Sequence, residues 1–276
     1  MQSILFQDRN PVYAPTSHEQ FASPAGQQRR EKLEAAVRSS NYEVRLAAPH
    51  ELDKVYALRY EVFLSDCTST DSAGSDCDQY DEHADHLVVT AGEQIVATYR
   101  VMPVDRVLQA GLLPYSSNEF EISALLESFC PTSAVELGRS CVHPNHRNGA
   151  LPKLLWSALA KYMMNNGRTE AFGCVSVFNA THGEAASLVD LFKMQKVWSD
   201  SLQCPPLMGV DSEYSSIATN QLKALVPPLL RSYLLLGARL YGGPSYDPIF
   251  KSHDFLIHFS TKTMTERCRK SLFSVS

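Results

Sequence analysis

A carboxylate and a guanidinium stand three residues apart in the segment Glu136-Leu-Gly-Arg139, shortly before a basic turn. The turn holds Arg147, Asn148 and Gly149, and a long segment with helical apolar spacing follows it. A strand, a glycine-containing turn and a helix in this order aim backbone N–H groups and the positive end of the helix dipole at one point, which suits a phosphate. The pattern indicates an enzyme whose donor substrate carries a phosphate-linked arm.

Glu136 is the candidate general base, acting directly or through a water. An α-amine is mostly protonated near neutral pH and must lose a proton before it attacks a carbonyl carbon. The alternative is that Glu136 is only a structural partner of Arg139. Because residues three apart lie on opposite faces of a strand, the two side chains meet only if a β-bulge intervenes.

The elements that must position these groups follow from hydrophobic periodicity. Alternation predicts strands over 42–47, 86–90, 94–102, 134–142, 171–178 and 255–259. Helical spacing predicts helices over 27–38, 50–64, 117–129, 151–165 and 184–197, the fourth ending at Asn166-Gly167. Intermingled strands and helices with hairpin-type neighbours favour one domain of the α/β (α+β) class with a mixed sheet.

The composition excludes several classes of protein. The chain has 276 residues, 44% of them hydrophobic, and a net charge of −5, which argues against sequence-independent nucleic-acid binding. No uninterrupted apolar run reaches the roughly 18 residues of a membrane-spanning helix, and no secretory signal is evident. The seven cysteines are therefore expected to be free thiols of a cytoplasmic protein.

The segment 136–144, with Arg147-Asn-Gly-Ala150 and Leu154-Leu-Trp156, resembles bacterial L-ornithine Nα-acyltransferases, a branch of the GNAT N-acyltransferase superfamily. Further segments that fit the same family are 58–63, 78–87, 98–100, 172–174, 228–230 and 236–238. The resemblance implies a GNAT-like mixed β-sheet flanked by helices over residues 41–260. Residues 1–40 are then an N-terminal arm with a short helix, and residues 261–276 a basic C-terminal tail.

The resemblance also implies a reaction. A 3-hydroxyacyl chain would pass from acyl carrier protein to the α-amine of L-ornithine, giving lyso-ornithine lipid. No cofactor is expected, since the phosphopantetheine arrives on the carrier protein. Ala150 and Pro152 replace small residues of ordinary GNAT turns, which suits a single phosphate better than the pyrophosphate of coenzyme A. Because the product is a lipid, the apolar segment 222–240 either rests on the inner membrane surface or forms a core helix.

The family pattern assigns roles to particular residues. The expected donor-binding residues are Val142, Arg147, Asn148, Gly149, Ala150, Lys153 and Trp156, of which Trp156 lines an acyl channel or packs on a neighbouring helix. The expected catalytic residues are Glu136, Arg139, Cys141 and Val142, with backbone N–H groups near the last two stabilising the oxyanion. A covalent role for Cys141 is disfavoured, and no metal site is expected at His83, Asp85 and His86 or at His143 and His146.

The expected acceptor-binding residues are Arg59, Phe63, Asp78, Asp81 and Arg100. The two arginines either bind the carboxylate of the acceptor or order the acidic loop 66–85 through ion pairs. The acids of that loop either suit the side-chain ammonium of ornithine or are simply solvated.

Three alternatives stay open. In the first, the acceptor is S-adenosylmethionine, glycine or another amino acid. A resemblance to acyl-homoserine-lactone synthases supports it, carried by Arg59, Phe63, Asp78, Asp81, Arg100, Glu136 and Arg139. The second is a membrane-associated, haemolysin-like binding protein, and the third is a coenzyme A acetyltransferase. Loss of amide synthesis on Glu136→Gln would separate an enzyme from a binding protein.

Overall fold

The computed structural model describes residues 38–39, 41–64, 74–147, 150–210 and 217–264. Three sequence predictions lie outside these ranges: the N-terminal arm with the helix over 27–38, most of the basic tail 261–276, and the turn residues Asn148 and Gly149. The acidic loop 66–85 is described from residue 74 onward, and the remaining predictions fall on described residues.

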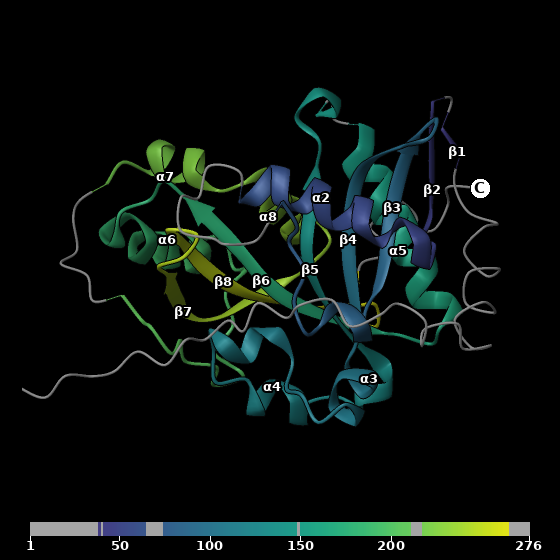
Figure 1. The fold of residues 1–276 in the computed structure, drawn as a ribbon. Coiled ribbons are helices and arrows are strands. Elements are labelled where there is room, and N and C mark those ends of the chain that lie inside the picture. Colours follow the sequence, from purple (N-terminus) through teal and green to yellow (C-terminus); the bar gives the residue numbers. More distant parts are fainter. Residues whose placement is uncertain (1–37, 40, 65–73, 148–149, 211–216, 265–276) are drawn as a thin grey trace, which may run out of the picture.

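A twisted mixed sheet forms the centre of the molecule (Figure 1). In the described residues its eight strands lie in the order β1-β2-β3-β4-β5-β6-β8-β7, and every neighbouring pair is antiparallel except β5 with β6. The strands are β1 (Arg38–Ser39), β2 (Tyr42–Leu46), β3 (Asp85–Ala91), β4 (Gln94–Pro103), β5 (Ala134–Val142), β6 (Glu170–Phe178), β7 (Arg239–Asp247) and β8 (Ser252–Ser260). The expected single domain with a mixed sheet is confirmed.

Helices cover both faces of this sheet. They are α2 (Leu52–Phe63), α3 (Val104–Gln109), α4 (Ser123–Glu127), α5 (Ala150–Asn165), α6 (His182–Met194), α7 (Thr219–Leu225) and α8 (Pro228–Leu235). Short 3-10 turns span Pro49–Glu51, Asp81–His83, Tyr115–Asn118, Pro131–Ser133 and Pro144–His146. Strand alternation sends one set of side chains toward α2 and α4 and the other toward α5, α6 and α8, where the largest apolar core lies.

Several elements differ from the sequence prediction, among them α3, which was not predicted, and β1, which contains Arg38 of the predicted helix 27–38. The helix predicted over 117–129 is broken into a 3-10 turn and α4, because Phe120 and its neighbour pair with the segment at 205–206. Strand β7 was not predicted, since Gly242, Gly243 and Pro244 interrupt its alternation. Gly242 has a φ of 67°, and a Cβ atom there would lie 2.0 Å from a backbone oxygen, so its conformation and its packing both require glycine.

The apolar segment 222–240 forms α7 and α8 on either side of Pro227. Leu222, Leu230 and Tyr233 are buried in the main core, so packing explains most of the apolar character of this segment. Within the described ranges, no helix combines the length and the apolar character that crossing a bilayer requires.

Candidate functional site

The sheet opens between β5 and β6. The two strands are parallel neighbours over three residue pairs, the last being Glu136 with Phe172, and then diverge as each continues with its other neighbour (Figure 1). A Cβ atom at Gly173 would lie 2.2 Å from the carbonyl oxygen of Leu137, so only glycine permits this approach just before the strands separate. The gap interrupts the ladder of hydrogen bonds and leaves room for a substrate within the sheet.

Strand β5 carries a bulge where it passes the gap. Between the pair Gly138–Arg100 and the pair Cys141–Thr98, β5 advances three residues while β4 advances two. Arg139 takes up the extra residue with a φ of 49°, in the left-handed region. Strand β5 therefore has a bulge, which the side chains of Glu136 and Arg139 would need in order to lie on the same face.

Glu136 lies at the start of the gap and is 1% exposed. Its Oε2 accepts a hydrogen bond from the backbone N–H of Tyr115 at 2.7 Å, and its Oε1 accepts from the N–H and the hydroxyl of Ser116 at 2.6 and 2.5 Å. Burial raises the pKa of Glu136, and the donors of Ser116 and Tyr115 partly offset that rise. The result is a fixed carboxylate with increased basicity, as a general base requires.

Three arginines and three aspartates form a buried ion network next to Glu136. Its members are Arg59, Arg100, Arg139, Asp76, Asp78 and Asp81. Arg59 is fully buried and binds Asp76 at 2.8 Å and Asp81 at 2.6 Å. Although burial opposes ionisation, the guanidiniums of Arg59 and Arg100 hold the pKa of Asp81 well below its usual range. Neither Arg59 nor Asp81 is among the residues that line the cleft at the gap, and Asp81 is buried in ion pairs and not solvated.

Arg100 differs from Arg59 because one edge of its guanidinium is unused. Its Nη1 donates to Asp78 at 2.6 Å and to Asp81 at 3.2 Å. Its Nε and Nη2 are buried and have no hydrogen-bond partner among the described residues, and both lie 3.9 Å from the Cβ position of Gly138. Because Arg100 and Gly138 line the cleft, this edge offers two parallel donors to a carboxylate there.

The cleft has a volume of about 240 Å³ and unlike walls. On the α2 side of the sheet it is polar, and among its lining residues there are Glu136, Arg100, Arg139, Tyr115, Asp247 and Asp254. On the α8 side it is apolar and is lined by Leu137, Val175, Pro227 and Leu229. Phe63, an expected acceptor-binding residue, also lines it. One reactant with charged groups and one with an apolar chain therefore suit opposite sides of the gap.

Asp247 of β7 and Asp254 of β8 form a polar wall of the cleft, the β7–β8 wall, across the gap from β4 and β5. Each is 5% exposed, and neither makes an ion pair within the described part of the chain. Asp247 accepts backbone hydrogen bonds from Ile249 and Phe250 at 2.7 and 3.1 Å, and Asp254 accepts a hydrogen bond from the hydroxyl of Ser252 at 3.3 Å. Burial raises the pKa of Asp254 to about 6.

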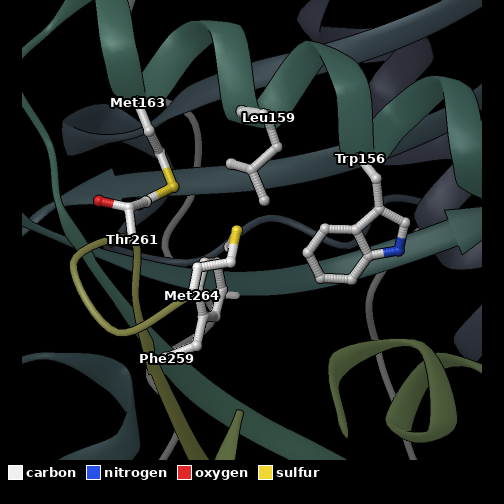
Figure 2. A pocket seen from close by; sticks show the side chains of 7 residues that line it. Trp156, Leu159, Met163, Phe259, Thr261 and Met264 are labelled. Atoms are coloured by element: carbon white, nitrogen blue, oxygen red, sulfur yellow. The ribbon is translucent and has the colours of Figure 1, made fainter. Parts of the chain in front are cut away.

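Trp156 lies in the core and not at the gap. It is 7% exposed, and its ring packs edge-on against Tyr233 of α8, with centroids 4.6 Å apart. A hollow of about 10 Å³ separates it from Phe259 and Met264 (Figure 2), which is room for a single water-sized sphere. Of the two roles predicted for Trp156, the structure gives it the packing role on a neighbouring helix.

The remaining predicted residues lie around the end of β5. Cys141 is buried under α2, and burial raises the pKa of its thiol to about 12, which leaves no thiolate for covalent catalysis. Arg147 is exposed, and its Nε donates to the carbonyl of Val142 at 3.1 Å. Lys153 is exposed on the first turn of α5, whose first residue is Ala150. The expected phosphate turn thus presents cations, and its central residues lie outside the described ranges.

Four residues of this site were not predicted: Tyr115, Ser116, Asp247 and Asp254. The first two act mainly through backbone N–H groups, which no sequence pattern marks. Asp247 ends β7, and Asp254 lies near the start of β8 on the face opposite Phe255, Ile257 and Phe259. Because the apolar alternation marks that other face as the core, the sequence gives no signal that Asp254 is buried.

Comparisons with known proteins agree with this geometry. The model of the acetyltransferase (GNAT) domain family matches residues 58–157. An L-ornithine N(alpha)-acyltransferase of Rhizobium meliloti is 34% identical over 239 residues, which cover 80% of this chain and 80% of the relative. An L-ornithine N(alpha)-acyltransferase of Rhodobacter capsulatus is 29% identical over 255 residues, covering 83% and 94%.

Among solved structures, the AHL synthase LasI superposes with a TM-score of 0.49 at 13% identity and covers 86% of this chain and 96% of its own. The CoA-dependent acyl-homoserine lactone synthase BjaI, solved with MTA, gives a TM-score of 0.48 at 14% identity and covers 81% and 80%.

Proposed function

The chain belongs to the family of L-ornithine N(alpha)-acyltransferases and is a GNAT-type acyltransferase, and from this premise we propose that it acylates the α-amine of L-ornithine. The proposed donor is 3-hydroxyacyl-acyl carrier protein, and the product is lyso-ornithine lipid. The amine nitrogen attacks the thioester carbonyl carbon, the C–S bond breaks, and the carrier thiol leaves with a proton. The observation that carries the proposal is the oriented, buried carboxylate of Glu136 at the opening between β5 and β6.

Glu136 would take the proton that the α-amine must lose. Its raised pKa favours proton uptake near neutral pH, and the donors of Tyr115 and Ser116 keep the carboxylate pointing at one place. In this proposal the backbone near Cys141 and Val142, beyond the bulge, stabilises the oxyanion that forms on the thioester carbonyl.

Arg100 would hold the carboxylate of the acceptor. The unused Nε and Nη2 donors form the edge of a guanidinium that binds a carboxylate in a bidentate manner, and Arg100 lines the same cleft as Glu136. A buried guanidinium edge without a partner costs free energy that a bound carboxylate would recover. This supports an amino acid as the acceptor.

The donor would enter from the apolar side of the gap. Leu137, Val175 and Leu229 suit an acyl chain, and the exposed Arg147 and Lys153 suit an acidic carrier protein. No protein cofactor is part of the proposal, because the carrier brings its own phosphopantetheine. Release of the lipid product at the inner membrane surface completes it.

The test is a competition among acceptors. Purified protein is incubated with 3-hydroxyacyl-carrier protein and equimolar ornithine, lysine, glycine and S-adenosylmethionine, and the products are read by mass spectrometry. The proposal expects N-acyl-ornithine as the main product. A different main amide would refute ornithine as the acceptor, and faster turnover of added acetyl-coenzyme A would refute the donor. Intact carrier thioester with no amide at all would refute the reaction.

A further inference from the structure

Ornithine carries a second amine, and the described aspartates of the acidic loop already have cationic partners. Asp78 and Asp81 bind Arg100, and Asp85 binds Arg106 and the hydroxyl of Tyr162. None of the described loop residues, 74–85, lines the cleft. Among the described residues, the acids that line the cleft besides Glu136 lie elsewhere in the chain.

The wall formed by β7 and β8 has the complementary arrangement. Asp254 pairs in register with Ser176 of β6 and Ser245 of β7, so its side chain faces the same side of the sheet as Glu136, where both line the cleft. Asp247 lies on the same face at the end of the turn. Neither carboxylate has a cationic partner within hydrogen-bond distance among the described residues.

The ion pairs around the cleft leave Asp247 and Asp254 without a cation. Arg139 pairs with Asp76 at 3.2 Å, and its guanidinium lies over the rings of Tyr115 and Phe250 at 5.1 and 5.7 Å. Its charge partly offsets the rise in the pKa of Asp254, but among the described residues it makes no ion pair with that carboxylate. The cleft thus offers the unused guanidinium edge of Arg100 on β4 and two carboxylates on β7 and β8. An amino acid with a carboxylate and a distant ammonium matches that polarity.

The charges of Asp247 and Asp254 act on residues that surround Glu136. Burial raises the pKa of Tyr115 to about 12, and the carboxylates of Asp254 and Asp247 contribute to the rise. Burial, followed by the charge of Asp254, holds the pKa of Cys174 well above its usual range. The Sγ atom of Cys174 lies 3.5 Å from the hydroxyl of Ser116, which itself binds Glu136.

We propose that Asp254, with Asp247 beside it, binds the side-chain ammonium of the acceptor and so selects amino acids that carry a second amine. The inference rests on the proposed function, because it assigns the specificity of that same cleft. It does not make Asp254 a proton acceptor in the reaction. The expected role is in the affinity for the acceptor, and the chemistry stays with Glu136.

The test compares two acceptors that differ only in the second amine. Ornithine and norvaline share the carbon chain and the α-amino acid group, and norvaline lacks the terminal nitrogen. KM and kcat are measured for both with 3-hydroxyacyl-carrier protein, in the wild type and in Asp254→Asn. The matched control is Asp190→Asn, an exposed aspartate on α6 far from the cleft lining.

The wild type is expected to prefer ornithine, and Asp254→Asn to raise the KM for ornithine about tenfold to a hundredfold, the range of a hydrogen bond to a charged group. The KM for norvaline should stay within about twofold, which also shows that the variant is folded. Asp247→Asn, which keeps an oxygen for the backbone donors of the turn, is expected to raise the KM for ornithine by less.

Two outcomes would overturn the inference while leaving the proposed function intact. In the first, the wild type acylates ornithine and norvaline with equal KM. In the second, Asp254→Asn keeps the preference for ornithine shown by the wild type and by Asp190→Asn. Absence of N-acyl-ornithine from every sample, including the wild type, would overturn both the proposed function and the inference.

Discussion

The molecule carries two groups of aspartates close to one cleft, and they differ in how their charges are satisfied. In the acidic loop, Asp76 and Asp81 each accept hydrogen bonds from arginines at 3.2 Å or less. On the β7–β8 wall, the hydrogen bonds that Asp247 and Asp254 accept within the described part of the chain come from neutral donors. Although burial opposes ionisation in both groups, the pKa of Asp81 is lowered by its arginines, whereas that of Asp254 is raised to about 6.

The difference distinguishes carboxylates that hold the fold together from the carboxylates that the inference assigns to acceptor binding. A buried carboxylate paired with its own arginine has its charge balanced within the protein, and its removal leaves an unpaired guanidinium. A buried carboxylate without a cation gains such a partner only when a ligand supplies one. The loop is rich in acids and the β7–β8 wall holds two, so the density of charge in a sequence does not identify the binding group.

The largest effect is expected at Glu136, which lies between the two groups. Glu136→Gln should lower kcat by about 10²–10⁴-fold, the usual range for loss of a general base, with little change in the KM for ornithine. Steady-state kinetics with a carrier-bound donor measures both. Glu127→Gln, an exposed residue of α4, is the control. A kcat of Glu136→Gln equal to that of the control would remove the base from the mechanism.

The next effect concerns stability and contrasts the two groups directly. Asp81→Asn should lower the free energy of unfolding at pH 8 by about 3–5 kcal/mol, because Arg59 and Arg100 lose a buried partner. Since the folded pKa of Asp81 is depressed, the wild type has this contribution above about pH 4 and loses it in acid.

Asp254→Asn should not be destabilising at pH 8. The folded pKa of Asp254 is raised, so its favourable contribution is present below about pH 4 and is lost as the pH rises through about 6. Denaturant unfolding of both variants measures the contrast. An equal loss of stability in Asp254→Asn would make the β7–β8 wall as structural as the loop.

The smallest effect is in the pH dependence of acceptor binding. Because an ammonium binds the ionised carboxylate, the KM for ornithine should be about tenfold higher at pH 5 than at pH 8, with a midpoint near pH 6. The titratable groups facing Asp254 are Asp247, Arg139, Tyr115 and Cys174. Raised pKa values keep Arg139 charged and the last two groups neutral in this range.

Norvaline separates Asp254 from Glu136 in that experiment, since both acceptors share the α-amine that Glu136 would serve. The ratio of the two KM values should change with pH in the wild type and be constant in Asp254→Asn. The contribution of Asp247 is read from Asp247→Asn. A ratio of the two KM values that stays constant with pH in the wild type would contradict the proposal that Asp254 and Asp247 bind the second amine.

Most of the fold could be predicted because its elements carry local signals. Strand β5 and helix α5 occur over the predicted residues, and the hairpin β3–β4 follows from alternation around Gly92. The break between the Tyr115 turn and α4 could not be predicted, since a contact with residues about 85 positions away in the chain decides it. Strand β7 has two glycines and a proline in place of an alternating pattern.

The structure places some of the predicted site residues together. Glu136, Arg139, Arg100 and Phe63 line one cleft, and the roles that the family pattern assigned to them stay predictions. Arg59 and Arg100 look equivalent in the sequence. The structure distinguishes them, because Arg59 is paired with aspartates whereas the Nε and Nη2 atoms of Arg100 have no hydrogen-bond partner among the described residues. Trp156 looked available for a substrate because side-chain type and helical position do not disclose what a neighbouring helix covers.

The sequence by itself determined which residues bear charge, where β5 and α5 lie, and the family to which the chain belongs, because these depend on local spacing and residue type. The tertiary structure decided which charged side chains lie close enough together to form ion pairs. The bulge at Arg139 brings its side chain into the ion network, and the pairing of β8 with β6 and β7 carries Asp254 to a cleft that opens beside Glu136, more than a hundred residues away in the chain. Charge satisfaction depends on distances between distant segments, which spacing along one chain does not encode.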